Sequence, residues 1–153
     1  MTPLRERLAE LGLTLPAAQA PLASYVPARR AGDLLHLSGH VARSDGAVVA
    51  GVVGADIDPG AAHDLARLTA LDLLASAAAA LGSADAVAGV VRITGFVRSA
   101  PGFHGQPAVI NGASDLFVEL LGERGRHARS AIGVSELPLG AALEIEAIFE
   151  IAR

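Results

Sequence analysis

Apolar residues recur at helical spacing in three parts of the chain. The first covers residues 2–11, where Thr2 and Pro3 are typical of an N-cap and a first helical residue. The second covers residues 59–81, and the third covers residues 107–121. Leucine and alanine are so frequent in the second part that we expect this helix to be buried over more than half of its circumference.

Other parts of the chain are rich in β-branched residues or alternate apolar with polar ones. The segments predicted as strands are residues 25–28, 34–41, 48–53, 87–98, 130–137 and 142–151. In the last segment Glu144, Glu146 and Glu150 occupy one face, and large apolar side chains occupy the other. This order of elements predicts an α+β protein with two helices packed on one face of a sheet, preceded by a short N-terminal helix.

The chain shows no linker and no internal repeat. Its 153 residues are therefore expected to form a single domain, residues 1–153, with residues 1–21 as the N-terminal helix and extension. The second face of a sheet this rich in valine and isoleucine must also be covered. Association with further copies of the chain is the simplest way to cover it.

Composition narrows the class of protein. Hydrophobic residues make up 52% of the chain and charged residues 18%, which is apolar for a small monomer and also favours association. The net charge is -4 and no basic run is present, so nucleic acid is disfavoured as a partner. There is no cysteine, which excludes disulfides and thiolate chemistry. Neither a signal peptide nor an apolar run of about 20 residues is present, so a cytoplasmic location is expected.

Two kinds of charged residue suggest chemistry near the end of the chain. Arg129 stands at the head of a predicted strand, and an arginine can hold a carboxylate through two parallel hydrogen bonds. Glu144 and Glu146 lie on one strand face, roughly 7 Å apart, and a glutamate can move a proton. By spacing alone, a surface or structural ion pair is the more common role for such an arginine, and a solvated strand face is the more common setting for such glutamates. The carboxylate pair would also permit glycosidase-like chemistry, but this signal is too common to be used.

None of the five histidines has the spacing of metal ligands. His36 and His40 are four residues apart on one strand, roughly 13 Å, which is too far to share an ion. No metal site is therefore predicted. Tyr25 is the chain's single tyrosine, and its hydroxyl requires a partner.

Four sequence blocks resemble the YjgF/RidA family of reactive imine and enamine deaminases, whose older name is endoribonuclease L-PSP. The resemblance covers about residues 22–152. Its blocks are A-S-Y-V-P-A around Tyr25, L-L-H-L-S-G-H-V at residues 34–41, V-I-N-G-A-S-D-L-F around Asn111, and A-R-S-A-I-G-V-S-E-L-P-L-G-A-A-L-E-I-E-A-I from Ala128. The last block is the most specific, because it is close to the family signature A-R-S-x-x-x-V-x-x-L-P-x-x-x-x-x-E-I-E-x-x-A.

The resemblance implies a fold, an assembly and a reaction. The fold is the chorismate-mutase-like α+β fold with a mixed sheet, assembled as a homotrimer with ligand clefts between adjacent subunits. The reaction is the hydrolysis of 2-aminoacrylate-type enamines and their imines to 2-oxo acids and ammonia, and it requires no cofactor.

The resemblance also implies roles for individual residues. Arg129 matches the arginine that binds the substrate carboxylate, assisted by the backbone N–H of Ala131. Glu144 matches the acid that orients or activates water. The positions that match the lining of the cleft are Tyr25, Ser38, Gly39 and Asn111.

Some positions depart from the family pattern, which leaves two further functions open. His40 stands where the family usually has glutamine, Gly133 where it has glutamate, and Ala131 where it has cysteine. His40 or His104 is a candidate to line the altered cleft, although each also fits an ordinary strand or loop position. These departures would suit a divergent branch, including a non-catalytic trimeric binder of small carboxylates with a regulatory role. A ribonuclease is the weaker alternative, since the chain lacks a basic patch.

Overall fold

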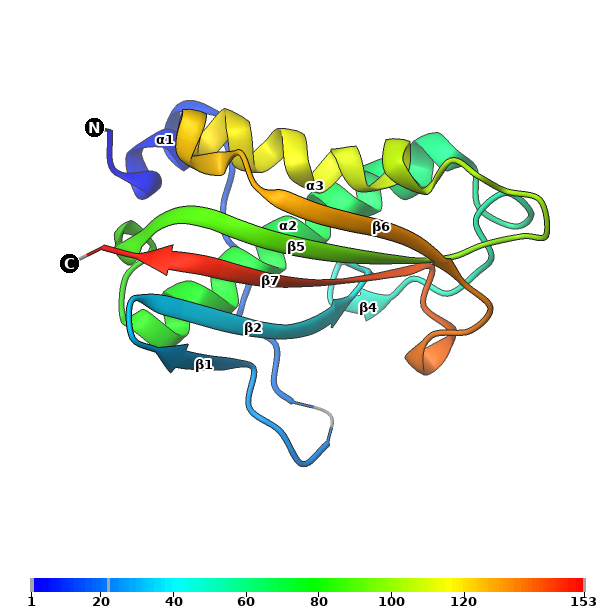
Figure 1. Cartoon of the computed structure of the whole chain (residues 1–153), viewed down its shortest axis with the longest axis horizontal. Helices are drawn as coiled ribbons and strands as arrows, with labels where there is room; N and C mark the ends of the chain where they lie inside the picture. Colours follow the sequence, from blue (N-terminus) through cyan, green and yellow to red (C-terminus); the bar gives the residue numbers. More distant parts are fainter. Residues whose placement is uncertain (1, 22, 153) are drawn as a thin grey trace.

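A computed structural model describes residues 2–21 and 23–152 of the chain (Figure 1). Met1, Leu22 and Arg153, which the predicted domain includes, lie outside the described residues. The helices are α1 (Leu4–Glu10), α2 (Pro59–Leu81) and α3 (Gln106–Leu121), with 3-10 turns η1 (Ala84–Ala86), η2 (Gly122–Gly125) and η3 (Pro138–Gly140). The strands are β1 (Ala28–Ala31), β2 (Leu34–Val41), β3 (Arg43–Ser44), β4 (Ala47–Val48), β5 (Val87–Arg98), β6 (Ala128–Val134) and β7 (Leu143–Ile151).

Five strands form one mixed sheet in the order β1-β2-β7-β5-β6. Neighbouring strands are antiparallel except β5 and β6, which are parallel because α3 carries the chain from the end of one to the start of the other. Figure 1 shows α2 and α3 on the far side of the sheet, with the near face open. The predicted α+β class, mixed sheet and two helices on one face are confirmed.

Helix α2 is the central element of the core. The Asp58 carboxylate caps its start by accepting a hydrogen bond from the Gly60 N–H at 2.9 Å, and Gly82 ends it in the left-handed conformation, with φ 79°. Every residue from 69 to 77 is buried. The expectation that this helix is buried over more than half of its circumference is confirmed.

The alternation predicted for β7 is also confirmed. Leu143, Ile145 and Phe149 are fully buried beneath the helices, whereas Glu146 and Glu150 are exposed on the open face. Phe149 meets Phe117 of α3 edge to face, with 5.6 Å between ring centroids. This contact joins the sheet to the helical layer.

The open face carries apolar side chains between its charged ones. Ile132 of β6 pairs with Phe96 of β5, and Phe96 pairs with Glu144, so all three side chains share the open face. Ile132 is 45% exposed.

No helix within residues 2–21 and 23–152 has the length and apolar character that a membrane span requires.

Two strand predictions are wrong. The strand expected at residues 25–28 begins at Ala28, and Tyr25 lies in a bend before it. The strand expected at residues 48–53 is reduced to the small β3–β4 hairpin and isolated bridges. Gly51 and Gly54 have φ 146° and 90°, which interrupts a continuous ladder even though Val53 is buried.

Three predicted boundaries are shifted. Helix α1 begins at Leu4, with Pro3 as its N-cap, and α3 begins at Gln106. The strand expected at residues 130–137 runs from Ala128 to Val134, because its ends are set by pairing with Arg92 to Arg98 of β5.

Candidate functional site

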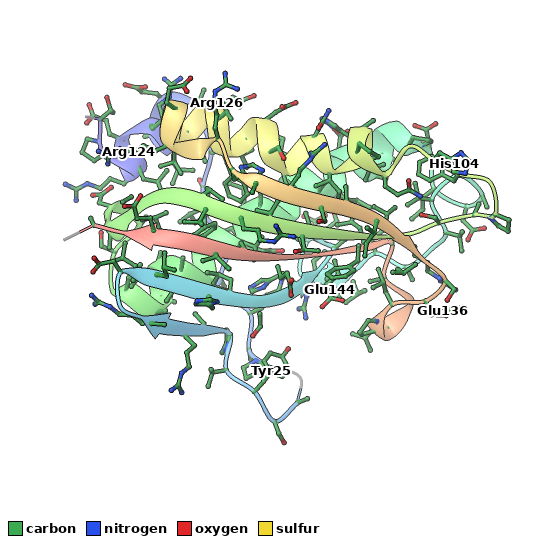
Figure 2. The ribbon with its side chains drawn as sticks, viewed as in Figure 1. Tyr25, His104, Arg124, Arg126, Glu136 and Glu144 are labelled. Atoms are coloured by element: carbon green, nitrogen blue, oxygen red, sulfur yellow. The ribbon has the colours of Figure 1, made fainter. Side chains whose placement is uncertain are left out.

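A cavity of about 470 Å³ opens beside the β2 and β7 strands. Four residues predicted to form the site line it: Tyr25, Ser38, Gly39 and Glu144. They come from the loop before β1, from β2 and from β7, and Figure 2 shows Tyr25 and Glu144 on these elements. We call these four residues the Glu144 half-site.

The shape of this half-site depends on a bulge in β2. The pairing of β2 with β7 shifts between Leu37 and His40, so one extra residue is accommodated around Ser38 and Gly39. The Ser38 hydroxyl donates to the Val26 carbonyl at 2.7 Å and ties the loop that carries Tyr25 to the bulge. A Cβ built on Gly39 would overlap the Glu144 carboxylate, so the glycine leaves the space that this carboxylate occupies.

The Glu144 carboxyl has a shifted pKa. Its burial raises the pKa of the carboxyl above its usual value, and the negative charge of Glu146 raises the pKa further. A carboxyl whose pKa is raised toward neutrality can both accept and return a proton.

Arg129 lies elsewhere on the protomer. It pairs with Ile93, whose side chain is fully buried beneath the helices, so the Arg129 side chain is directed to the helical face of the sheet. There its Nη1 donates to the Ser114 hydroxyl at 3.0 Å and its Nη2 to the Pro107 carbonyl at 3.1 Å. In the part of the chain that the structure describes, Arg129 forms no salt bridge with a carboxylate.

The other two predicted residues accompany Arg129. Asn111 is exposed on α3, on the helix face that Pro107 and Ser114 share. Ala131 follows two residues after Arg129 on the same face of β6 and packs against the core. We call Asn111, Arg129 and Ala131 the Arg129 half-site.

The two half-sites are separated within one chain. Glu144 stands between the buried Leu143 and Ile145 and faces the open side of the sheet, opposite to Arg129. Strand β5 lies between β6 and β7, and Ile93 and Phe96, which pair with Arg129 and Glu144, are three residues apart on it. The two backbones are therefore separated by about 10 Å across the sheet and by about 10 Å along it. A single small substrate cannot contact both residues of one copy.

Of the two histidines that the sequence made candidates to line the cleft, His40 lines the cavity and His104 does not. His40 lines the cavity, but its ring is buried, with Nδ1 2.7 Å from the Ser38 carbonyl oxygen and Nε2 2.7 Å from the Ser76 hydroxyl of α2. Burial lowers the pKa of His40, so its ring is neutral at pH 7. His104 does not line the cavity, and Figure 2 shows it in the loop between β5 and α3.

The sequence analysis missed Gln19 in the extension after α1. Gln19 lines the cavity and donates from Nε2 to the buried Asp72 carboxylate at 2.9 Å. The extension has no hydrophobic period, so nothing in the sequence indicated that it crosses the cavity.

The Gln106 side chain leaves little room for a side chain at position 133, where the sequence has glycine. A Cβ at this position would lie 2.8 Å from Nε2 of Gln106, which is itself held by the Ser99 hydroxyl and the Phe103 carbonyl. The Gln106 amide thus occupies the space next to β6 that a larger residue at 133 would need.

Within residues 2–21 and 23–152, no three or more His, Asp or Glu side chains are grouped so that they could hold a metal ion.

A mixed sheet in this order, two helices on one face and these blocks of residues define a RidA-like α+β protein. The chain belongs to the Endoribonuclease L-PSP family, also called YjgF/RidA, whose family model matches residues 16–151. Protein TCP17 of Trypanosoma cruzi is 44% identical over 146 residues, which cover 94% of this chain and 91% of that relative.

Solved structures of other proteins resemble this chain to different degrees. The protein Atu1372 from Agrobacterium tumefaciens, described as having unknown function, is 46% identical, with a TM-score of 0.88 over 97% of this chain and 92% of its own. TdcF of E. coli, solved with bound serine, is 25% identical, with a TM-score of 0.61 over 91% of this chain and 96% of its own. This difference agrees with the expectation of a divergent branch.

Proposed function

We propose that the chain is a hydrolytic deaminase of small reactive enamines and imines of the 2-aminoacrylate and 2-iminobutanoate type. The products are a 2-oxo acid and ammonia. One observation carries the proposal: Arg129 is half-buried, held at two points by α3, and forms no salt bridge with a carboxylate among the described residues. A cation held in this way suits a carboxylate that comes from a ligand.

In this proposal Arg129 binds the substrate carboxylate and the Ala131 N–H assists it. Glu144 takes a proton from a water molecule as the oxygen attacks the imine carbon, and passes it to the imine nitrogen, which gives a carbinolamine. It then takes the proton of the new hydroxyl as the C=O bond forms and the C–N bond breaks, and passes this second proton to the nitrogen that leaves as ammonia. An enamine first becomes the imine by accepting a proton at its β-carbon and losing one from its nitrogen. The raised pKa of Glu144 supports its part in both proton transfers.

Each complete site would combine the Arg129 half-site of one copy with the Glu144 half-site of a neighbour. The separation of the two residues in one chain supports this arrangement, and a homotrimer would supply three such sites. The serine bound to TdcF, a relative of 25% identity, supports a small ligand that carries a carboxylate.

The first test is the release of 2-oxo acid from enzymatically generated 2-aminoacrylate or 2-iminobutanoate. Arg129→Ala should lower kcat/KM on the order of 100-fold, because hydrogen bonds to a charged group are lost. Glu144→Gln should lower kcat by about 100-fold or more, since proton transfer is lost. The exposed Arg126 and Glu6 provide matched controls, Arg126→Ala and Glu6→Gln. A wild-type protein no faster than the uncatalysed reaction would reject the deaminase.

A second test addresses the shared site. Arg129→Ala and Glu144→Gln chains, each inactive alone, are co-expressed and purified together. If every site draws on two copies, random assembly restores about a quarter of the sites. An inactive mixture beside an active wild type would contradict the shared site.

The alternative is a non-catalytic trimeric binder of small carboxylates. It is favoured by Gly133, where the Gln106 amide fills the space beside β6, and by the neutral, buried His40. Stoichiometric binding of a 2-oxo acid with no turnover of either imine would select it.

The ribonuclease is a weaker alternative, because the net charge is -4. RNA cleavage abolished by Arg129→Ala would reverse this order.

A further inference from the structure

Arg129 is the first member of a chain of three hydrogen bonds. Its Nη1 donates to the Ser114 hydroxyl at 3.0 Å, and this hydroxyl lies 2.9 Å from Nε2 of His127. Nδ1 of His127 in turn lies 2.6 Å from the Gly125 carbonyl oxygen. The three residues that these hydrogen bonds link to Arg129 are Ser114 of α3, His127 of the segment before β6 and Gly125 of η2.

The chemistry of the groups fixes the direction of every bond. A carbonyl oxygen only accepts, so Nδ1 of His127 carries the hydrogen. In a neutral ring Nε2 then has the lone pair, and the Ser114 hydroxyl donates to it. The oxygen of Ser114 keeps its own lone pairs for the N–H of Arg129. Burial lowers the pKa of His127, the hydrogen bond to the Gly125 carbonyl opposes this shift, and the charge of Arg129 adds to it, so the ring is neutral at pH 7.

Packing holds the His127 ring in this orientation. The ring meets the fully buried Phe117 edge to face, with 6.0 Å between centroids and an interplanar angle of 90°. Gly125, which supplies the carbonyl, approaches α3 so closely that a Cβ there would overlap the Phe117 carbonyl. Both ends of the chain of bonds are therefore anchored to α3.

The Arg129 guanidinium is held at two points of one helix. Ser114 holds Nη1 and the Pro107 carbonyl holds Nη2, and these residues are two turns apart on α3. A guanidinium held in this way loses little side-chain freedom when it binds a carboxylate.

We propose that Ser114 and His127 are positioning residues that orient Arg129 for the carboxylate of a ligand. The proposal rests on the proposed role of Arg129 as the carboxylate-binding residue, but not on turnover.

The groups around His127 explain what protonation would do. Arg129 faces it from β6, Ser114 and Phe117 from α3, and the Gly125 carbonyl from η2. The nearby charges Glu123 and Arg126 pair with each other at 3.0 Å on the surface. A second proton on the ring would turn Nε2 into a donor, reverse the Ser114 hydroxyl and place positive charge beside Arg129.

The first experiment reads the histidine directly in the full chain. Nitrogen-15 NMR of the His127 ring at pH 7 should give the neutral form with hydrogen on Nδ1. Ser114→Ala should shift the Nε2 resonance, whereas His36→Gln, on the exposed side of β2, should leave it unchanged. A ring that is protonated, or that carries its hydrogen on Nε2, would overturn the proposal.

The second experiment measures ligand affinity and rate. Ser114→Ala and His127→Ala should weaken pyruvate binding and raise KM by about 10-fold, with kcat changed less than about 3-fold, since only the carboxylate contact is disturbed. Ser114→Thr and His127→Gln keep the hydroxyl and an acceptor, and should restore most of the affinity.

The results separate the two proposals. Unchanged pyruvate affinity in Ser114→Ala and His127→Ala would overturn the positioning role, and so would a loss that Ser114→Thr and His127→Gln fail to restore. An absence of turnover in the wild type would reject the deaminase alone, because the NMR and pyruvate measurements still decide the positioning role. If Ser114→Ala does not fold, Ser114→Thr and the wild-type histidine spectrum provide the answer.

Discussion

At the scale of single residues, the Glu144 half-site depends on one missing side chain. Gly39 stands against the Glu144 carboxylate, and its backbone does not need a left-handed conformation. The sequence marked both residues through the family blocks. Only the structure explains why the first must be small.

We therefore expect Gly39→Ala to impair function without loss of stability. The added methyl group displaces the flexible end of the Glu144 side chain, and a misplaced catalytic group can cost about 100-fold in rate. The measurements are kcat with an imine substrate and the thermal midpoint. Gly46→Ala is a poor control because its φ is 80°, so Ala47→Ser on the exposed β4 is used. A normal kcat in Gly39→Ala would contradict the role of this contact.

Asp72 is a buried carboxyl that is not part of either half-site. Its pKa is raised to about 6, mainly by burial, while the hydrogen bond from Gln19 and the charge of Arg43 oppose the shift. The folded state therefore prefers the protonated form. The stabilisation by that form is complete below the unfolded pKa of 3.8 and is lost as the pH rises through about 6.

Asp72→Asn should accordingly stabilise the protein at pH 8. The gain in free energy of unfolding is ~3 kcal/mol at most and shrinks toward zero as the pH falls below 4. Urea unfolding across this range measures it, with the exposed Asp64→Asn of the same helix as the control. A gain that is independent of pH would show that ionisation of Asp72 is not its cause.

At the scale of elements, the contact between α2 and α3 depends on Gly112. A Cβ on this residue would overlap the His63 carbonyl of α2, so the two helix backbones approach each other directly. Helical periodicity predicted both helices but could not predict this approach, because it depends on how the helices cross.

Gly112→Ala should destabilise the protein by about 1–3 kcal/mol, since overpacking costs more than the gain in helix propensity. Chemical denaturation measures the loss. Asp115→Ala, exposed on the same helix, should change stability by less than about 0.5 kcal/mol. An equal effect of the two substitutions would refute the close approach.

At the scale of the whole molecule, the open face of the sheet bears Phe96, Ile132 and Ile148 among its charges. No described helix covers it, and the half-sites lie on opposite faces of the protomer. Both facts favour an assembly in which copies associate through this face.

Ile132→Glu should therefore reduce the mass of the assembly toward that of one chain, because it places a charge in the apolar contact. Light scattering after size exclusion measures the mass. Ala79→Glu, at the exposed end of α2, should leave it unchanged. A wild-type protein that is already a monomer would reject both the assembly and the shared site.

The sequence by itself determined the class of fold, the two long helices, the alternation of β7 and the family, because each depends on local period or on a contiguous motif. It misplaced the strands at residues 25–28 and 48–53, where pairing and glycine conformation decide. Only the tertiary structure separated Arg129 from Glu144 and joined Arg129 to Ser114 and His127. Which face a strand residue occupies, and which helix lies over it, depend on long-range packing that no local pattern contains.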